Sequence, residues 1–229
     1  RSQSQFNPLL AKAGQGSPSN PIKLAEMKDP TGRNHAAFPF LSESTGNFYI
    51  IAGDENFPWG VMATKGQPSN PRGGFHFLNF SDPDNPKEDA IFEVPEAGSH
   101  NLWVYGDILI AGNYQAGLRI VDISGELLGD IYKQGREIGH YVPYHKEGKI
   151  PNAPMVWGAQ PYKEYIFFAD MNSGLYCIKL EDLNEGSKLV LAAAGNIKRE
   201  LVKNTPDIDL VAGFSNPNLV SNGNLVIEG

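Results

Sequence analysis

The chain has 229 residues, and its 19 basic and 26 acidic side chains give a formal net charge of −7. This balance, without a Lys/Arg cluster, argues against a nucleic-acid partner, and no apolar run approaches the ~18 residues of a membrane span. Cys177 is the only cysteine, which excludes an intrachain disulfide and a Cys-based zinc site. Gly and Pro together make up about 18% of the residues, against about 12% on average, so many turns are expected and a helical bundle is not.

Short apolar runs that are typical of strands recur from residue 35 onward. The first unit has candidate strands at residues 35–40, 48–54, 74–80 and 91–94, and a turn segment at 81–86 precedes the last of them. Each run is rich in β-branched and aromatic residues or opens with glycine after a turn, as buried strands do.

Two further units repeat this pattern along the chain. Their candidate strands lie at residues 101–105, 108–113 and 117–123, and then at 156–161, 165–170 and 174–180. The equivalent glycines stand at positions 74, 117 and 174, which are 43 and 57 residues apart. Residues 189–201 are predicted to supply the outer strand of the third unit, with a short helix as the alternative.

Four antiparallel strands per unit at this spacing are typical of β-propeller blades. We therefore predict an all-β fold, a β-propeller with blades at approximately residues 35–97, 99–132 and 155–200. A β-sandwich and an irregular β-solenoid are the alternatives. A βαβ arrangement is excluded because no amphipathic helix of adequate length separates the strands.

Both ends of the chain carry part of the same pattern. Residues 17–28 are predicted as the outer strand of a flanking blade, and residues 217–229 as the inner hairpin of another, with a turn at Asn222-Gly223. Known propellers have at least four blades, so we expect a partial propeller that missing chain or another subunit completes. Such a chain is expected to be unstable or aggregated when expressed alone.

The third strand of the second unit, Gly117 to Ser124, resembles the hallmark of the LVIVD-repeat β-propellers, which include the choice-of-anchor B family. Residues 99–104 are similar to the His-Asn-containing inner strand of that family, and residues 170–175 to its Asp-x-Asn-Ser-Gly-Leu segment. The resemblance covers roughly residues 17–185. Two of the repeats depart from the pattern, because Asn79 and Lys179 replace the usual Asp.

This resemblance implies an exported protein, located in the periplasm or outside the cell, and leaves its biochemical role open. The chain begins with Arg1 rather than Met, which is expected of a processed or excised chain. The lack of cysteine pairs agrees with this expectation.

Strand order predicts that side chains from three blades meet at one rim of the central channel. In an up-and-down blade the first strand starts where the second ends, so His35 lies next to Asp54 and Glu55. By the same pairing, His100 meets Asn113 and Trp157 meets Asp170. Two long connections, residues 55–73 and 133–155, emerge on this rim, where binding surfaces are usually built. The predicted binding-face residues are Phe57, Trp59, Asn113, Tyr141, Tyr144, Trp157 and Asp170.

Four of the rim residues form a candidate metal site. His35, Asp54, Glu55 and His100 offer imidazole and carboxylate ligands, which suit one divalent transition-metal ion. The alternative is that they hydrogen-bond the blade tops to one another. We assign no catalytic residue, since there is no Gly-x-Ser-x-Gly elbow and Cys177 lies inside a predicted strand.

Two functions follow from these patterns. The first is a non-enzymatic, exported β-propeller that recognises another protein or assembles into a larger envelope or extracellular structure, with other protein subunits as partners. The second is a metal-dependent enzyme with a histidine and carboxylate site at the mouth of the channel.

Overall fold

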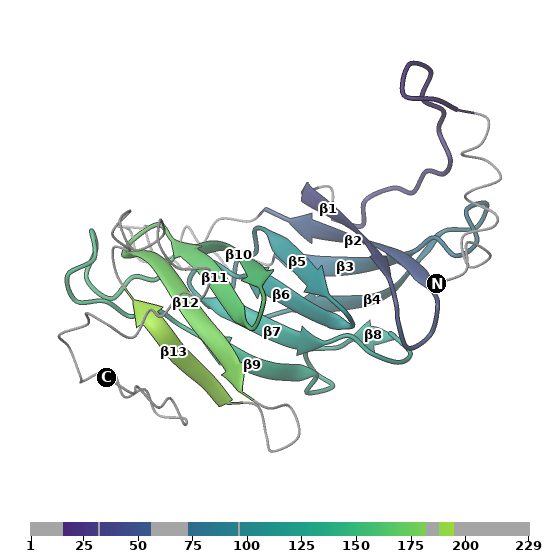
Figure 1. Ribbon diagram of the computed structural model, residues 1–229. Coiled ribbons are helices and arrows are strands. Elements are labelled where there is room, and N and C mark those ends of the chain that lie inside the picture. The colour runs from purple at the N-terminus through teal and green to yellow at the C-terminus, as the bar shows by residue number, and fades with distance from the viewer. Residues whose placement is uncertain (1–15, 32, 56–72, 96, 182–187, 195–229) are drawn as a thin grey trace.

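The computed structural model describes residues 16–31, 33–55, 73–95, 97–181 and 188–194 (Figure 1). These residues form thirteen strands, and no helix occurs among them. The strands make three sheets of antiparallel neighbours, apart from one short parallel pairing. The prediction of an all-β fold is therefore confirmed for the described part of the chain. No helix in that part is long and apolar enough to cross a membrane.

Each sheet is built from strands that follow one another along the chain, as in a meander. The first sheet contains β1 (Asn34–Leu41), β2 (Phe48–Asp54), β3 (Gly74–Asn79) and β4 (Lys87–Glu93). The second contains β5 (Leu102–Tyr105), β6 (Ile108–Gly112), β7 (Leu118–Asp122) and β9 (Glu137–Tyr141). The third contains β10 (Val156–Tyr162), β11 (Tyr165–Asp170), β12 (Gly174–Glu181) and β13 (Lys188–Ala194). The second sheet lies between the other two (Figure 1).

The outer edge of the second sheet differs from the prediction. Its fourth strand is β9, which lies beyond the predicted blade boundary at residue 132. The chain first returns to the first sheet, where β8 (Gly129–Asp130) pairs in parallel with β4. Two apolar side chains explain this detour, since Leu127 and Ile131 are fully buried against the first sheet. Burying such a side chain stabilises the fold by ~1.5–3 kcal/mol. This favours the detour over an immediate return of the chain to the second sheet.

The predicted N-terminal outer strand is absent. Residues 16–31 form no strand, and an isolated bridge joins Ser17 and Asn20. In Figure 1 this segment extends away from the sheets. The predicted C-terminal hairpin, residues 217–229, lies outside the described residues. The predicted outer strand of the third unit is confirmed over β13, which takes the place of the alternative short helix there, and residues 195–201 lie outside the described residues.

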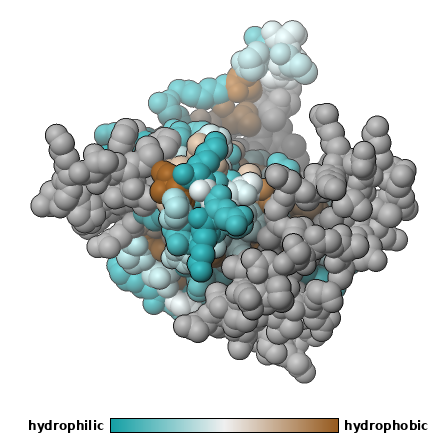
Figure 2. Space-filling view, turned by 90° about the vertical axis from the view of Figure 1, so that its left-hand side faces the viewer, coloured by the Kyte–Doolittle hydropathy of each residue, from teal (hydrophilic) through white to brown (hydrophobic). Residues whose placement is uncertain are grey.

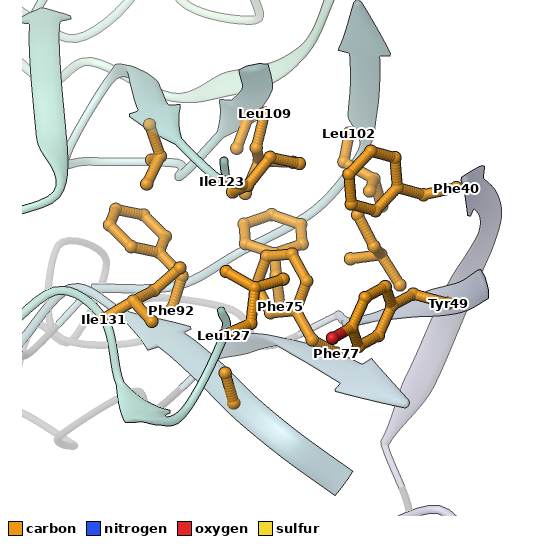
Figure 3. Packing of buried hydrophobic residues seen from close by; sticks show 14 of the residues in the cluster. Phe40, Tyr49, Phe75, Phe77, Phe92, Leu102, Leu109, Ile123, Leu127 and Ile131 are labelled. Carbon is orange, nitrogen blue, oxygen red and sulfur yellow. The ribbon is translucent and has the colours of Figure 1, made fainter. Parts of the chain in front are cut away.

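The first core lies between the first and second sheets (Figure 3). Aromatic rings of the first sheet, among them Phe75, Phe77 and Phe92, face Leu109 of β6 across the interface. Leu109 is fully buried, as are all three rings. This contact fixes the first sheet against one face of the second.

The second core uses the opposite face of the same strands. Ile110 on β6 and Ile120 on β7 point toward the third sheet, where they pack with Phe168 and Ile178. Successive side chains of a strand point to opposite faces, so the continuous apolar run of β6 contributes to both cores. The second sheet is therefore buried on both sides.

In the first and second units, the polar residue at the end of the third strand closes a turn. The Asp122 carboxylate accepts a hydrogen bond from the backbone N–H of Ser124 at 2.8 Å. Asn79 does the same for Ser81 at 2.9 Å, so the amide replaces the carboxylate without loss of the turn. Both are Asx turns, in which a short polar side chain bonds the backbone two residues on.

In the first sheet, two buried ionisable side chains, His76 and Asp54, are joined by the partly exposed Glu88. His76 on β3 is almost fully buried, with Nδ1 2.6 Å from Glu88 Oε1 and Nε2 3.4 Å from Asp54 Oδ2. Burial opposes the charge on the ring, but hydrogen bonds and charge interactions with Asp54 and Glu88 outweigh it and raise the pKa of His76 to about 9. His76 is therefore a buried imidazolium held between two carboxylates.

This imidazolium makes the free energy of unfolding depend on pH in the neutral to alkaline range. The pKa of about 9 in the folded state lies above the ~6.5 of an unfolded histidine, so the contribution is complete below about pH 6.5 and is lost as pH rises through 9. We expect the free energy of unfolding in urea to fall by roughly 2–3 kcal/mol over that interval. H76Q should abolish this slope, and H140Q, at an exposed histidine, should retain it. An equal slope in H76Q and wild type would contradict the assignment.

Candidate functional site

An irregularity in the first sheet presents His35. The β1–β2 ladder pairs Asn34 with Asp54 and Ala36 with Gly53, and the register shifts between Asn34 and Ala36. His35 lies at this bulge. The extra residue of a bulge is left unpaired and its side chain points in a new direction. On the other strand, the Glu55 backbone N–H bonds to the carbonyl of Arg33 at 3.1 Å, which extends the pairing past the end of β2.

The second sheet presents His100 just before β5. The backbone N–H of His100 donates to the Gly112 carbonyl, and the Gly112 N–H donates to the Asn101 carbonyl, each at 3.0 Å. Across the boundary to the third sheet, the Asn101 N–H donates to the Trp157 carbonyl at 2.9 Å. The approach is so close that a Cβ on residue 112 would lie 2.7 Å from that carbonyl. Glycine is therefore required at position 112.

Trp157 occupies a second bulge, in the third sheet. The β10–β11 register shifts between Val156 and Gly158, which is the counterpart of the shift at His35. The indole ring stacks on His100, with centroids 5.3 Å apart and planes 9° apart. Its exposed fraction is 38%, so the outer part of the ring faces solvent.

Three potential metal ligands meet between the first and second sheets. His35 Nδ1 lies 3.2 Å from Glu55 Oε2, and His100 Nε2 lies 3.6 Å from Glu55 Oε1. The two imidazole rings are 4.3 Å apart. One ligand atom from each of the three residues lies within 4.8 Å of the others. Ligands held at ~2.1 Å from one ion are typically about 3–3.5 Å apart, so the cluster needs only a small contraction around a metal.

The outward hydrogen bonds of the two imidazoles decide which nitrogens face the centre. The ring of His100 donates from Nδ1 to the Trp157 carbonyl at 2.9 Å, because a carbonyl can only accept. His35 Nε2 lies 3.2 Å from the amide oxygen of Asn101 and donates to it. In the neutral rings the two remaining nitrogens, His100 Nε2 and His35 Nδ1, carry lone pairs that point at the Glu55 carboxylate.

The electrostatics of His100 keep its inward nitrogen available. Burial, followed by the neighbouring His35, lowers the pKa of His100 below its usual 6.5, and the Trp157 carbonyl and Glu55 only partly offset this. The neutral ring therefore dominates at neutral pH. The lone pair of His100 Nε2 and the Glu55 carboxylate, 3.6 Å apart, repel each other unless a cation lies between them.

Tyr114 is a site residue that the sequence analysis missed. Its hydroxyl donates to Glu55 Oε1 at 3.1 Å, and its ring meets His100 edge-on, with centroids 5.5 Å apart. Asn101, which orients His35, was also missed. Each is a direct chain neighbour of a residue that strand order had placed at the rim, Asn113 or His100. Their position next to a predicted rim residue was the signal in the sequence that could have identified them.

Two of the predicted rim residues are structural. The Asp54 carboxylate bonds to His76 and to the hydroxyl of Thr31, so it does not join the cluster of His35, Glu55 and His100. Asp170 is buried and closes its own turn by accepting the backbone N–H of Ser173 at 2.7 Å.

Asn113 is fully buried beside Tyr114, and its amide nitrogen donates to the Gly98 carbonyl at 3.2 Å. Its Oδ1 has no hydrogen-bond partner among the described residues. A buried acceptor of this kind is one that a bound water or ligand can satisfy. Asn113 therefore lies next to the site without joining the ligand cluster.

The predicted aromatic loop residues divide into three cases. Tyr141 is not in a recognition loop, because it belongs to β9 and packs in the second core against Phe168. Tyr144 follows that strand and is exposed. Phe57 and Trp59 lie outside the described residues.

Comparisons with known proteins add no family to these observations. Neither the models of protein families nor the curated protein sequences give a match to the chain. The function must therefore be argued from the geometry of the site.

Proposed function

We propose that this protein binds a divalent transition-metal ion through His35, Glu55 and His100. One observation carries the proposal. His100 donates its outer N–H to a backbone carbonyl and turns the lone pair of Nε2 toward Glu55 Oε1, an oxygen 3.6 Å away that also accepts from the Tyr114 hydroxyl. A metal-bound histidine usually holds its other ring nitrogen in this way, which fixes the tautomer and the ring orientation. Protonation of His35 would satisfy its own contact with Glu55 but not that of His100.

The ligand types indicate the kind of metal. Two imidazoles and one carboxylate suit Zn²⁺, Fe²⁺ and related ions, whereas Mg²⁺ and Ca²⁺ take oxygen ligands. Three protein ligands leave at least one coordination position open, which is typical of catalytic rather than structural sites. The alternative of a metal-dependent enzyme therefore has specific support from this geometry.

The proposal includes a β-propeller in which the three sheets are consecutive blades. Support comes from the four-strand meanders in chain order and from the cores between neighbouring sheets. The described residues contain three such blades, fewer than the four to eight of known propellers, so further chain or other protein subunits are proposed to supply the rest. The repeat that resembles the LVIVD family supports this assignment and an exported location, in the periplasm or outside the cell.

A second candidate function is protein recognition by this scaffold. The first strands of the second and third sheets expose aromatic side chains, which are enriched in protein interfaces. They are Trp103, Tyr105, Trp157 and Tyr162. Figure 2 shows a different aspect, the left-hand side of Figure 1, where the described residues are mostly hydrophilic. A scaffold role and a metal site are compatible in one molecule.

Metal titration of the purified chain tests the leading proposal. After treatment with a chelator, wild type is expected to bind one equivalent of Zn²⁺ in calorimetry. H35A, H100A and E55Q should each lower the affinity by more than about 100-fold, because each removes a direct ligand.

The matched control replaces the two other histidines that lie outside the first sheet. The double variant H140A/H145A should bind like wild type. Absence of stoichiometric binding in wild type, or equal binding in H100A, would leave the cluster as a hydrogen-bonded link between sheets.

Trp157 provides an independent optical readout. Its indole stacks on His100, so a paramagnetic ion such as Co²⁺ at the site should quench its fluorescence. W157F should lose most of the quenching, and W103F, which removes an equally exposed indole, should keep it. Quenching that persists in W157F would place the ion elsewhere.

The propeller proposal predicts association. Sedimentation velocity on the purified chain should show oligomers or aggregates, because blades without neighbours leave apolar walls in water. A soluble monomer that unfolds cooperatively would contradict the need for additional blades.

A further inference from the structure

Tyr114 holds together all three sheets at the proposed metal site. It lies two residues after the end of β6, and its ring is fully buried. Its backbone N–H donates to the Val156 carbonyl at 2.9 Å, and the Val156 N–H donates back at 3.0 Å. This isolated bridge joins the second sheet to the third, while the phenol reaches Glu55 of the first.

The backbone of Tyr114 has a conformation that tyrosine rarely adopts. Its φ is 45°, in the left-handed region. For a non-glycine residue this costs of order 1 kcal/mol or more, and it persists only where the surroundings impose it. Here the turn requires it, because the Gly117 N–H also bonds to the Tyr114 carbonyl at 3.0 Å. The strained backbone therefore fixes where the side chain enters the site.

The phenol contacts two of the three proposed ligands. Its hydroxyl lies 3.1 Å from Glu55 Oε1, and its ring edge meets the face of His100 at 78°. Because a carboxylate oxygen can only accept, the phenol O–H is the donor in the contact with Glu55.

This donor makes the two oxygens of Glu55 unequal. Oε1 accepts from Tyr114 and lies 3.6 Å from His100 Nε2, whereas Oε2 faces His35 Nδ1 at 3.2 Å and accepts no hydrogen bond from Tyr114. A carboxylate oriented by a second partner loses less rotational freedom when it coordinates a metal. Hydrogen-bonding partners of this type typically change metal affinity by 10–100-fold.

We propose that Tyr114 is a positioning residue that orients Glu55 and limits it to coordination through Oε2. This role rests on the metal site proposed above. In this role the strained turn at Tyr114 does more than join the second and third sheets, because the same residue sets the geometry of the ligands.

The test compares Y114F with Y176F in the full chain. Phe removes only the hydroxyl, and Tyr176 is a matched control because it is buried and its hydroxyl bonds to Ser173 in the third sheet, away from the ligands. Zn²⁺ affinity is measured by calorimetry, and ligand geometry by the visible absorption spectrum of the Co²⁺-loaded protein. Y114F should bind roughly 10–100-fold more weakly and give a shifted Co²⁺ spectrum. Y176F should match wild type in both.

The outcomes separate the two proposals. If wild type binds no metal, both are overturned. If wild type binds and Y114F matches it in affinity and spectrum, the metal site stands and the role of Tyr114 is rejected.

A loss of folding in Y114F is detected by circular dichroism. In that case the role of Tyr114 is tested by the ultraviolet difference spectrum of W157F upon Zn²⁺ addition, in which the absorption of Trp157 is removed. A perturbed tyrosine band supports the contact, and an unchanged band rejects it.

Discussion

Apolar side chains on both faces of the second sheet hold the structure together. On β6, Leu109 faces the first sheet and Ile110 faces the third, and β7 divides in the same way between Val121 and Ile120. A strand buried on both faces must be apolar at every position, unlike one with a solvated face. The two cores fix the outer sheets relative to the middle one, so that the starts of their first strands lie together. Every contact in the proposed metal site depends on this arrangement.

The site is formed where regular pairing ends. His35 and Trp157 sit at register shifts in the first and third sheets, and His100 lies just outside the ladder of the second. Bulges release a side chain from the alternation of the strand and are often found beside functional sites. The backbone between the sheets is held closely, because Asn101 donates to Trp157 and Gly112 leaves room for that approach. The ligands are thus held by a rigid framework, which favours a preorganised site.

Two adjacent carboxylates in this structure have opposite electrostatic partners. Asp54 faces His76, whose pKa is raised so that the ring carries its own positive charge. Glu55 faces His100, whose pKa is lowered so that the ring is neutral. The first pair is complete without any further group. The Glu55 carboxylate instead meets the unprotonated nitrogen of His100 and the hydroxyl of Tyr114, and this difference is why we propose Glu55 rather than Asp54 as a metal ligand.

The sequence alone determined the first three strands of each sheet, their grouping into three units and the meeting of His35, His100 and Trp157. These follow from local rules, since apolar runs, turn residues and the two-residue period of a strand are visible in the chain. The tertiary structure decided that Glu55 rather than Asp54 joins the histidines, because a one-residue bulge changes which side chain faces the site and leaves no sequence signal. It also decided that Leu127 and Ile131 draw β8 to the first sheet and that Tyr114 reaches Glu55. Such choices depend on which burial and hydrogen bonds are available between sheets, and only the folded chain brings those partners together.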